Sequence, residues 1–156
     1  MTIRKATEND VPQITQLFYE TVNSVNQKDY SKEQITVWSE SSRNVDYWLK
    51  CIETQYFVVT EKDNWIIGFA SLNENACVEF MYSHKDFQNI GVATELINAL
   101  ESEAYNKNFM SIWSDVSITA KPFFLKKGFI EIEVYTKKVH YTAFENTIMI
   151  KVLNKN

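Results

Sequence analysis

Hydrophobic residues in the first third of the chain recur at the spacing of amphipathic helices. After a short stretch that predicts a first strand, Thr2–Ala6, the residues that keep this spacing are Val11, Ile14, Leu17, Phe18 and Val22. Capping boxes are predicted at Thr7 with Asp10 and at Ser31 with Gln34, and each marks a helix start. A short helix from Asn44 groups Tyr47, Trp48 and Cys51 on one face. The polar segment Asn23–Tyr30 predicts a loop between helices.

From residue 56 the pattern changes to β-branched and aromatic residues separated by polar turns. Three such segments follow one another, Tyr56–Thr60, Trp65–Leu72 and Ala76–Tyr82, and predict an antiparallel meander. The remaining predicted elements are a helix Gly91–Tyr105, a strand Phe109–Trp113, a short helix Ile118–Lys127 and two strands, Phe129–Val139 and Phe144–Leu153. This order predicts an α+β fold around a mixed sheet. Because no linker or repeat interrupts it, we expect one domain over residues 1–156.

Composition and charge exclude several classes of function. The net charge is −4, and no run of Lys or Arg forms the basic stripe that a nucleic-acid backbone requires. No apolar run approaches a membrane span, and no signal-peptide core is present, so we expect a cytoplasmic protein. The two cysteines, Cys51 and Cys77, are expected to be buried free thiols. No Cys or His spacing indicates a metal site.

The segment Gln88-Asn89-Ile90-Gly91-Val92-Ala93 leads from a predicted strand directly into a predicted helix. The first turn of a helix carries unpaired backbone N–H groups and the positive end of the helix dipole, so it can bind a phosphate. Gly91 and Ala93 leave the backbone accessible to such an anion. The segment matches neither the phosphate loop GxxxxGK[ST] nor the dinucleotide motif GxGxxG.

Two motifs together resemble the GNAT superfamily of acyl-CoA-dependent N-acetyltransferases. Gln88, Gly91 and Ala93 match its phosphate motif, Gln/Arg-x-x-Gly-x-Gly/Ala. The second signature is met at Ala120, Phe123, Gly128 and Phe129, with Ser117 in place of Asn and Phe124 in place of Tyr. Further residues, Asp29-Tyr30-Ser31 and Trp38 among them, resemble the YafP-like bacterial branch. The resemblance implies about seven mostly antiparallel strands flanked by helices on both faces, and acetyl-CoA as the acetyl donor.

The resemblance also implies where the donor binds. The expected donor-binding residues are Met81, Tyr82, Ser83, Gln88, Asn89, Gly91, Val92, Ala93, Thr94, Ser117 and Phe124. A backbone N–H near Met81–Tyr82 is expected to stabilise the oxyanion of the attacked thioester. Glu79 is the candidate general base, and strand alternation predicts that it shares a face with Met81 and Ser83. Tyr30 is the candidate for binding a cationic acceptor.

Several alternatives remain open at this point. Phe124 stands where the family commonly has a tyrosine that protonates the departing CoA thiolate. Either the thiolate leaves without an acid, or a downstream tyrosine, Tyr135 or Tyr141, takes the role of that acid. The acceptor is a small-molecule amine or a protein amino group, and a homodimer is possible. Two other functions compete with acetyl transfer: a non-catalytic acyl-CoA-binding module and a cofactor-free protein-interaction domain.

Overall fold

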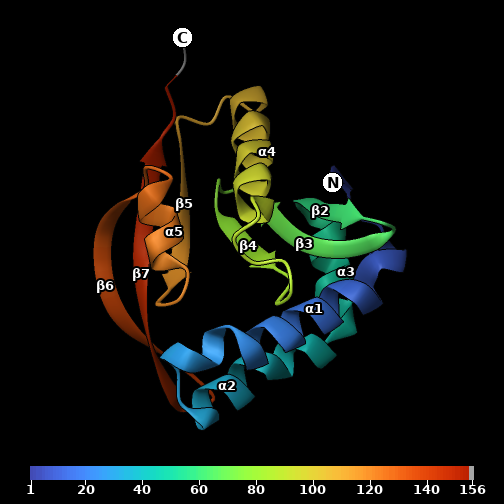
Figure 1. Cartoon of the computed structure of the whole chain (residues 1–156). Coiled ribbons are helices and arrows are strands. Elements are labelled where there is room, and N and C mark those ends of the chain that lie inside the picture. The colour runs from blue at the N-terminus through green and yellow to red at the C-terminus, as the bar shows by residue number, and fades with distance from the viewer. Residues whose placement is uncertain (155–156) are drawn as a thin grey trace.

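The computed structural model describes residues 1–154, so positions 155 and 156 of the predicted domain lie outside the described part. Its helices and strands follow the order predicted from the sequence (Figure 1). The strands are β1 Thr2–Lys5, β2 Tyr56–Lys62, β3 Trp65–Leu72, β4 Val78–Ser83, β5 Ser111–Ser117, β6 Ile130–Val139 and β7 Thr142–Val152. The α-helices are α1 Val11–Ser24, α2 Lys32–Ser39, α3 Val45–Thr54, α4 Val92–Asn106 and α5 Lys121–Lys126. Short 3-10 helices are η1 Glu8–Asp10, η2 Asn26–Asp29 and η3 Glu40–Arg43.

The seven strands form two antiparallel sheets. One has the order β1-β2-β3-β4 and the other the order β5-β7-β6. The predicted meander is confirmed, as is the mostly antiparallel character, but the strands do not form one continuous ladder. A parallel bridge joins Cys77, just before β4, to Trp113 of β5, and the Ser114 hydroxyl adds a hydrogen bond to the carbonyl of Val78. Beyond these contacts the two strands diverge (Figure 1), and residues of both strands line one cleft.

Helices cover both faces of the first sheet, as predicted. One core is built around α4, with Leu96, Ile97 and Leu100 packed against β-strand residues and against Phe124 of α5. The other core contains Ile14 and Phe18 of α1, Ile35 of α2 and Trp48 of α3. In Figure 1, α4 stands on one side of β3 and β4 while α1 crosses on the other. The sheet is therefore sandwiched between two helical layers.

The segment Asn23–Tyr30 is not a loop, contrary to the prediction. α1 continues to Ser24, and η2 follows at once. The Asn23 amide donates to the carbonyl of Tyr19 (2.8 Å), and the Val25 N–H donates to the carbonyl of Thr21 (2.8 Å). The polar residues extend the helix because one of them bonds back to the preceding turn.

The predicted strand Phe109–Trp113 was placed too early, and the helix Ile118–Lys127 too long. β5 runs to Ser117 because Ile112, Ser114 and Val116 alternate into the core. The buried Ser114 hydroxyl donates to the carbonyl of Val78 (2.7 Å), which satisfies it inside the core. Residues 118–120 form a turn, and α5 begins at Lys121, next to a proline suited to a first helical turn.

Candidate functional site

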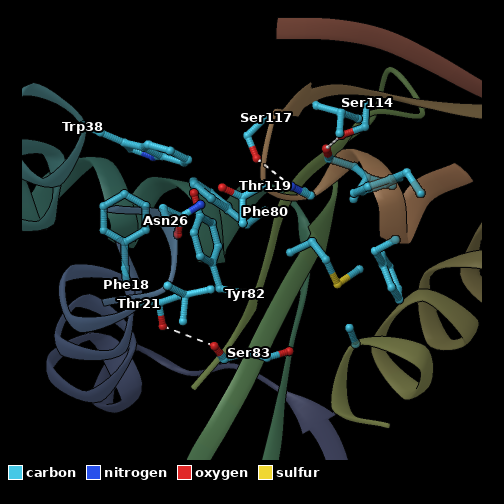
Figure 2. A pocket seen from close by; sticks show the side chains of 18 of the residues that line it. Phe18, Thr21, Asn26, Trp38, Phe80, Tyr82, Ser83, Ser114, Ser117 and Thr119 are labelled. Atoms are coloured by element: carbon cyan, nitrogen blue, oxygen red, sulfur yellow. Dashed lines mark hydrogen bonds between the residues drawn. The ribbon is translucent and has the colours of Figure 1, made fainter. Parts of the chain in front are cut away.

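An open cleft of about 1590 Å³ lies where β4 separates from β5. Its walls come from α1, η2 and α2 on one side and from β5, α5 and β7 on the other (Figure 2). The expected donor-binding residues, Glu79 and Tyr30 all line this cleft, whereas Tyr135 and Tyr141 do not: the lining includes Tyr30, Glu79, Met81, Tyr82, Ser83, Gln88, Asn89, Gly91, Val92, Ala93, Thr94, Ser117 and Phe124. Segments far apart in the sequence thus converge on one site.

The start of α4 presents unpaired amides to the cleft. The first hydrogen bond of this helix runs from the Glu95 N–H to the carbonyl of Gly91 (3.0 Å). Within residues 1–154, the preceding N–H groups of Val92, Ala93 and Thr94 have no hydrogen-bond acceptor. Gly91 has a φ of +90°, and its missing Cβ faces open space, so this glycine is required by backbone conformation. Unpaired amides at the positive end of a helix dipole are chemically suited to bind an anion.

Gln88 fixes the loop that leads into α4. Its amide donates to the carbonyls of Ser83 (2.7 Å) and His84 (3.1 Å). The Ser83 carbonyl also accepts a hydrogen bond from Thr21 of α1 (3.2 Å). The Gln88 side chain therefore closes the loop on itself and holds the backbone, while the accessible donors are the amides beyond Gly91.

Gly68 on β3 sets how closely α4 approaches the sheet. A Cβ at this position would lie 2.5 Å from Cγ1 of Val92 and 3.1 Å from Cδ1 of Leu96. Both are residues of the first turns of α4. Because Gly68 has no side chain, the start of α4, which carries the unpaired amides, can pack close against β3.

The backbone of Met81 faces the gap between the sheets. The His84 N–H donates to the Ile67 carbonyl on β3 (2.8 Å), whereas the Ser83 carbonyl points away from β3 to Thr21 and Gln88. Because backbone groups alternate in direction along a strand, the N–H of Met81 also points away from β3. No β5 residue pairs with it, since the two strands have already diverged.

Glu79 does not share a face with Met81, so the prediction from alternation is wrong. Ser71 pairs with Phe80 but Leu72 pairs with Val78, which makes Glu79 the extra residue of a β-bulge. Val78 and Met81 consequently both pack toward α4. Glu79 turns toward α3, yet still lines the cleft.

Three donors meet on one oxygen of Glu79. Its Oε2 accepts hydrogen bonds from the Tyr47 hydroxyl (3.1 Å), the Gln55 amide (3.1 Å) and the Cys51 thiol (3.6 Å). Burial, together with the nearby Glu79 charge, raises the pKa of Tyr47 and raises the pKa of Cys51 to about 11. Both groups therefore keep their protons at neutral pH. The sequence grouped Tyr47 and Cys51 on one helix face, but gave no signal that this face meets Glu79.

Tyr30 joins the two sides of the cleft. Its hydroxyl accepts a hydrogen bond from the N–H of Ile118 (2.8 Å), and its ring lies 5.1 Å from that of Trp38. Burial raises its pKa. Ser117 caps the same turn, since its hydroxyl accepts from the N–H of Ala120 (3.1 Å). Tyr30 is positioned to brace the cleft as well as to contact a ligand in it.

Neither Tyr135 nor Tyr141 has the position and the free hydroxyl that would let it act as an acid in place of a tyrosine at position 124. Phe124 is 2% exposed and packs edge-on against Phe129 (4.9 Å between ring centres). The Tyr135 hydroxyl donates to Asp115 (2.7 Å), and burial raises its pKa to about 12. Tyr141 is 97% exposed, in the turn after β6.

The buried residue Asn26 also lines the cleft. It was not identified from the sequence, because it lies in the polar segment that was predicted to be a loop.

No helix within residues 1–154 is long and apolar enough to cross a membrane. In the same part of the chain, no three His, Cys, Asp or Glu side chains lie close enough together to hold a metal ion.

Comparison with known proteins identifies relatives over nearly the whole length. The acetyltransferase (GNAT) domain family matches residues 26–147. The uncharacterized N-acetyltransferase YafP of Escherichia coli K12 is 25% identical over 147 residues, which cover 94% of this chain and 93% of YafP. The crystal structure of a GCN5-related N-acetyltransferase from Rhodopseudomonas palustris superposes with a TM-score of 0.94 at 26% identity, covering 97% of this chain and 95% of that one.

A second solved structure shares the fold at lower identity. The PaiA N-acetyltransferase of Thermoplasma acidophilum, crystallised in complex with coenzyme A, gives a TM-score of 0.81 at 19% identity, covering 97% of this chain and 98% of that one. The family match spans most of the described chain, and the fold agrees with it throughout. The chain belongs to the GNAT acetyltransferase family.

Proposed function

We propose that the protein transfers an acetyl group from acetyl-CoA directly to a primary amine in a ternary complex. The observation that carries the proposal is the set of three unpaired amides at Val92, Ala93 and Thr94, beside the open edge of β4. When the pyrophosphate of acetyl-CoA is bound at these amides, the arm that carries the acetyl group can extend along the gap between β4 and β5. The family membership and the coenzyme A complex of the PaiA relative support this reading.

Each lining residue has a proposed part in binding the donor. The amides of Val92, Ala93 and Thr94 bind the pyrophosphate, while Gly91 and Asn89, both at positive φ, shape the loop. Gln88 positions this loop rather than contacting the phosphates. Tyr82 and Ser83 border the acyl arm on β4, and Ser117 and Phe124 border it on the opposite wall. The Met81 N–H donates to the oxyanion that forms at the thioester carbonyl.

Glu79 is proposed to accept the proton of the attacking amine, directly or through a water molecule. An alkylamine has a pKa near 10.4, so providing the free base at pH 7 costs about 4–5 kcal/mol. Oε2 of Glu79 is occupied by its three donors, whereas Oε1 accepts no hydrogen bond within residues 1–154. Oε1 is therefore the atom available for the proton.

The departing thiolate needs no dedicated acid. A thiol pKa near 8.5 lies about 1.5 units above neutrality, so leaving unprotonated costs only about 2 kcal/mol. Phe124 supplies no proton, and the Tyr135 hydroxyl is already engaged with Asp115. We infer that the thiolate leaves unaided.

An assay of CoA release with a panel of primary amines tests the proposal. We expect amine-dependent release that falls strongly in Glu79→Gln, with acetyl-CoA binding unchanged. Binding without release for any amine would favour a non-catalytic acyl-CoA-binding module. If saturating acetyl-CoA failed to raise the melting temperature, a cofactor-free interaction domain would be favoured, because a ligand at 100 times its Kd adds about 2.7 kcal/mol to stability.

We also propose that β6 pairs with β6 of a second copy. β6 is an edge strand, and its residues Ile130, Ile132 and Val134 are 60%, 61% and 49% exposed. Acidic residues precede Val134 and lysines follow it, so antiparallel pairing of two copies places opposite charges together. Light scattering of the intact chain is expected to give a dimer, and Ile132→Lys a monomer; a monomeric parent protein would overturn the proposal.

A further inference from the structure

The Asn26 side chain is buried in the cleft wall without a hydrogen-bond partner. The residue is 5% exposed and lines the cleft. Within residues 1–154, neither its amide nitrogen nor its carbonyl oxygen makes a hydrogen bond. Both atoms retain some contact with the cleft, because neither is among the fully enclosed unpaired atoms.

Other buried polar side chains of this cleft are all engaged. Thr21 donates to the Ser83 carbonyl (3.2 Å), Ser114 donates to the Val78 carbonyl (2.7 Å), and Asn146 donates to Asp115 (3.0 Å). Asn26 is the exception among them, and its free hydrogen-bonding capacity is open to the cleft, where a ligand can satisfy it.

Aromatic rings line the same side of the cleft as this carboxamide. Figure 2 shows Asn26 on the same side of the cleft as Phe18, Trp38 and Tyr82. Phe18 and Tyr82 lie edge-on with 5.0 Å between their centres, and Trp38 packs on Tyr30 at 5.1 Å. Such walls favour an apolar body, while the neutral carboxamide favours one uncharged polar group on that body.

The same cleft joins this carboxamide to Glu79. Asn26 and Glu79 both line it, and Tyr82, which Figure 2 shows beside Asn26, lies on the same strand as Glu79. A small amine in the cleft can therefore place its nitrogen toward Glu79 and its other end toward Asn26.

Building on the proposed acetyl transfer, we propose that Asn26 selects the acceptor: it hydrogen-bonds a neutral polar group, such as a hydroxyl, at the far end of a small amine with an apolar body. The amine nitrogen lies at Glu79, the body among the rings, and the hydroxyl at the carboxamide. Asn26 is then a specificity-determining residue that contacts the substrate but takes no part in proton transfer.

Tyramine and phenethylamine test this assignment, because they differ only by the hydroxyl. We expect kcat/KM to be about three- to tenfold higher for tyramine in the parent protein, which is the range for one net hydrogen bond. Asn26→Ala and the bulkier Asn26→Leu should bring the ratio close to one and leave the KM for acetyl-CoA unchanged. The control Asn23→Ala removes an amide that bonds to Tyr19 outside the cleft, and should keep the preference.

Stability separates this role from a structural one. Asn26→Ala removes no hydrogen bond of the native structure, so its melting temperature should equal or exceed that of the parent. Equal rates for the two amines, an unchanged ratio in both variants, or transfer only to other amines would overturn the assignment while acetyl transfer stands. A strong preference for tyrosine over tyramine would also overturn it, since a carboxylate would then be the group recognised. Absence of CoA release with every amine would instead overturn the proposed function.

Discussion

The Tyr47 hydroxyl lies 3.1 Å from Oε2 of Glu79 and ties α3 to the bulge of β4. The pKa of Tyr47 is raised by burial and by this carboxylate, so the hydroxyl remains a donor across the range in which the protein is assayed. With Gln55 and Cys51 bonded to the same oxygen, the side chain of Glu79 is held in one orientation. These contacts from α3 and the residue that follows it therefore set the direction of Oε1.

Tyr47→Phe should lower kcat about three- to tenfold, because it removes one of the hydrogen bonds that orient Glu79. The KM for acetyl-CoA should stay the same, since Tyr47 lies away from the α4 amides. Steady-state kinetics with one amine measure both. Tyr105→Phe is the matched control: it removes a hydroxyl bonded to the Asn154 carbonyl (2.7 Å), outside the cleft. Combined with Glu79→Gln, Tyr47→Phe should add no further loss; full additivity would contradict the positioning role.

Gly68→Ala should weaken donor binding more than it weakens acceptor binding. Its new methyl group would meet Val92 at 2.5 Å and push the start of α4 away from the sheet. We expect a stability loss of about 1–3 kcal/mol together with a raised Kd for CoA, measured by calorimetry. Gly128→Ala provides the comparison, because it destabilises the protein through backbone strain (φ +93°) and not through a clash with α4: only Lys151 is nearby. An unchanged Kd in Gly68→Ala would contradict the role of this close approach.

Stability at acidic pH should depend on Asp10. Arg4 donates two hydrogen bonds to its carboxylate (2.8 and 2.9 Å), which lowers the pKa of Asp10, and the Thr7 N–H donates a third (2.8 Å). Because the pKa is lower in the folded than in the unfolded state, the stabilisation is present above the unfolded value of about 3.9 and disappears as the pH falls through the folded value.

Asp10→Asn should therefore cost about 1–2 kcal/mol at pH 7, a figure kept small because Arg4 is 41% exposed. The difference from the parent should shrink below about pH 4 in urea titrations. Glu8→Gln, an exposed change in the same turn, should have little effect at any pH. A deficit in Asp10→Asn that stays constant from pH 7 to pH 3 would count against the ion pair.

Phe124→Tyr tests whether the reaction needs an acid. If the thiolate leaves unaided, the new hydroxyl should leave the pH–rate profile between pH 6 and pH 9 unchanged. Some stability should be lost, about 1–3 kcal/mol, because Phe124 is buried and packed by Phe129. A new alkaline limb in the profile would show that an acid at this position takes part.

The α4 side of the cleft could be predicted from the sequence because its signals are local. The start of α4 follows from the glycine before it and from the apolar spacing after it, and both lie within a few residues of Val92. The capping boxes at Thr7 and Ser31 were likewise predicted from neighbouring residues and are present. Local backbone chemistry is enough to place such features.

The side of the cleft around Glu79 and Asn26 was harder to predict because it depends on register and on distant contacts. Glu79 was assigned to the wrong face, since a bulge inserts a residue without changing the composition of the strand. Asn26 was assigned to a loop because its polarity gave no indication that the fold buries it. The split into two sheets was also not predicted, because the divergence of β5 from β4 after one bridge depends on contacts between segments far apart in the sequence.

A crystal structure of the protein soaked with acetyl-CoA shows directly whether the α4 amides bind the donor. We expect the pyrophosphate within hydrogen-bond distance of the Val92, Ala93 and Thr94 amides, with the thioester carbonyl at the Met81 N–H and its carbon facing Oε1 of Glu79. Acetyl-CoA bound elsewhere, or a soaked crystal in which side chains close over the start of α4, would contradict it.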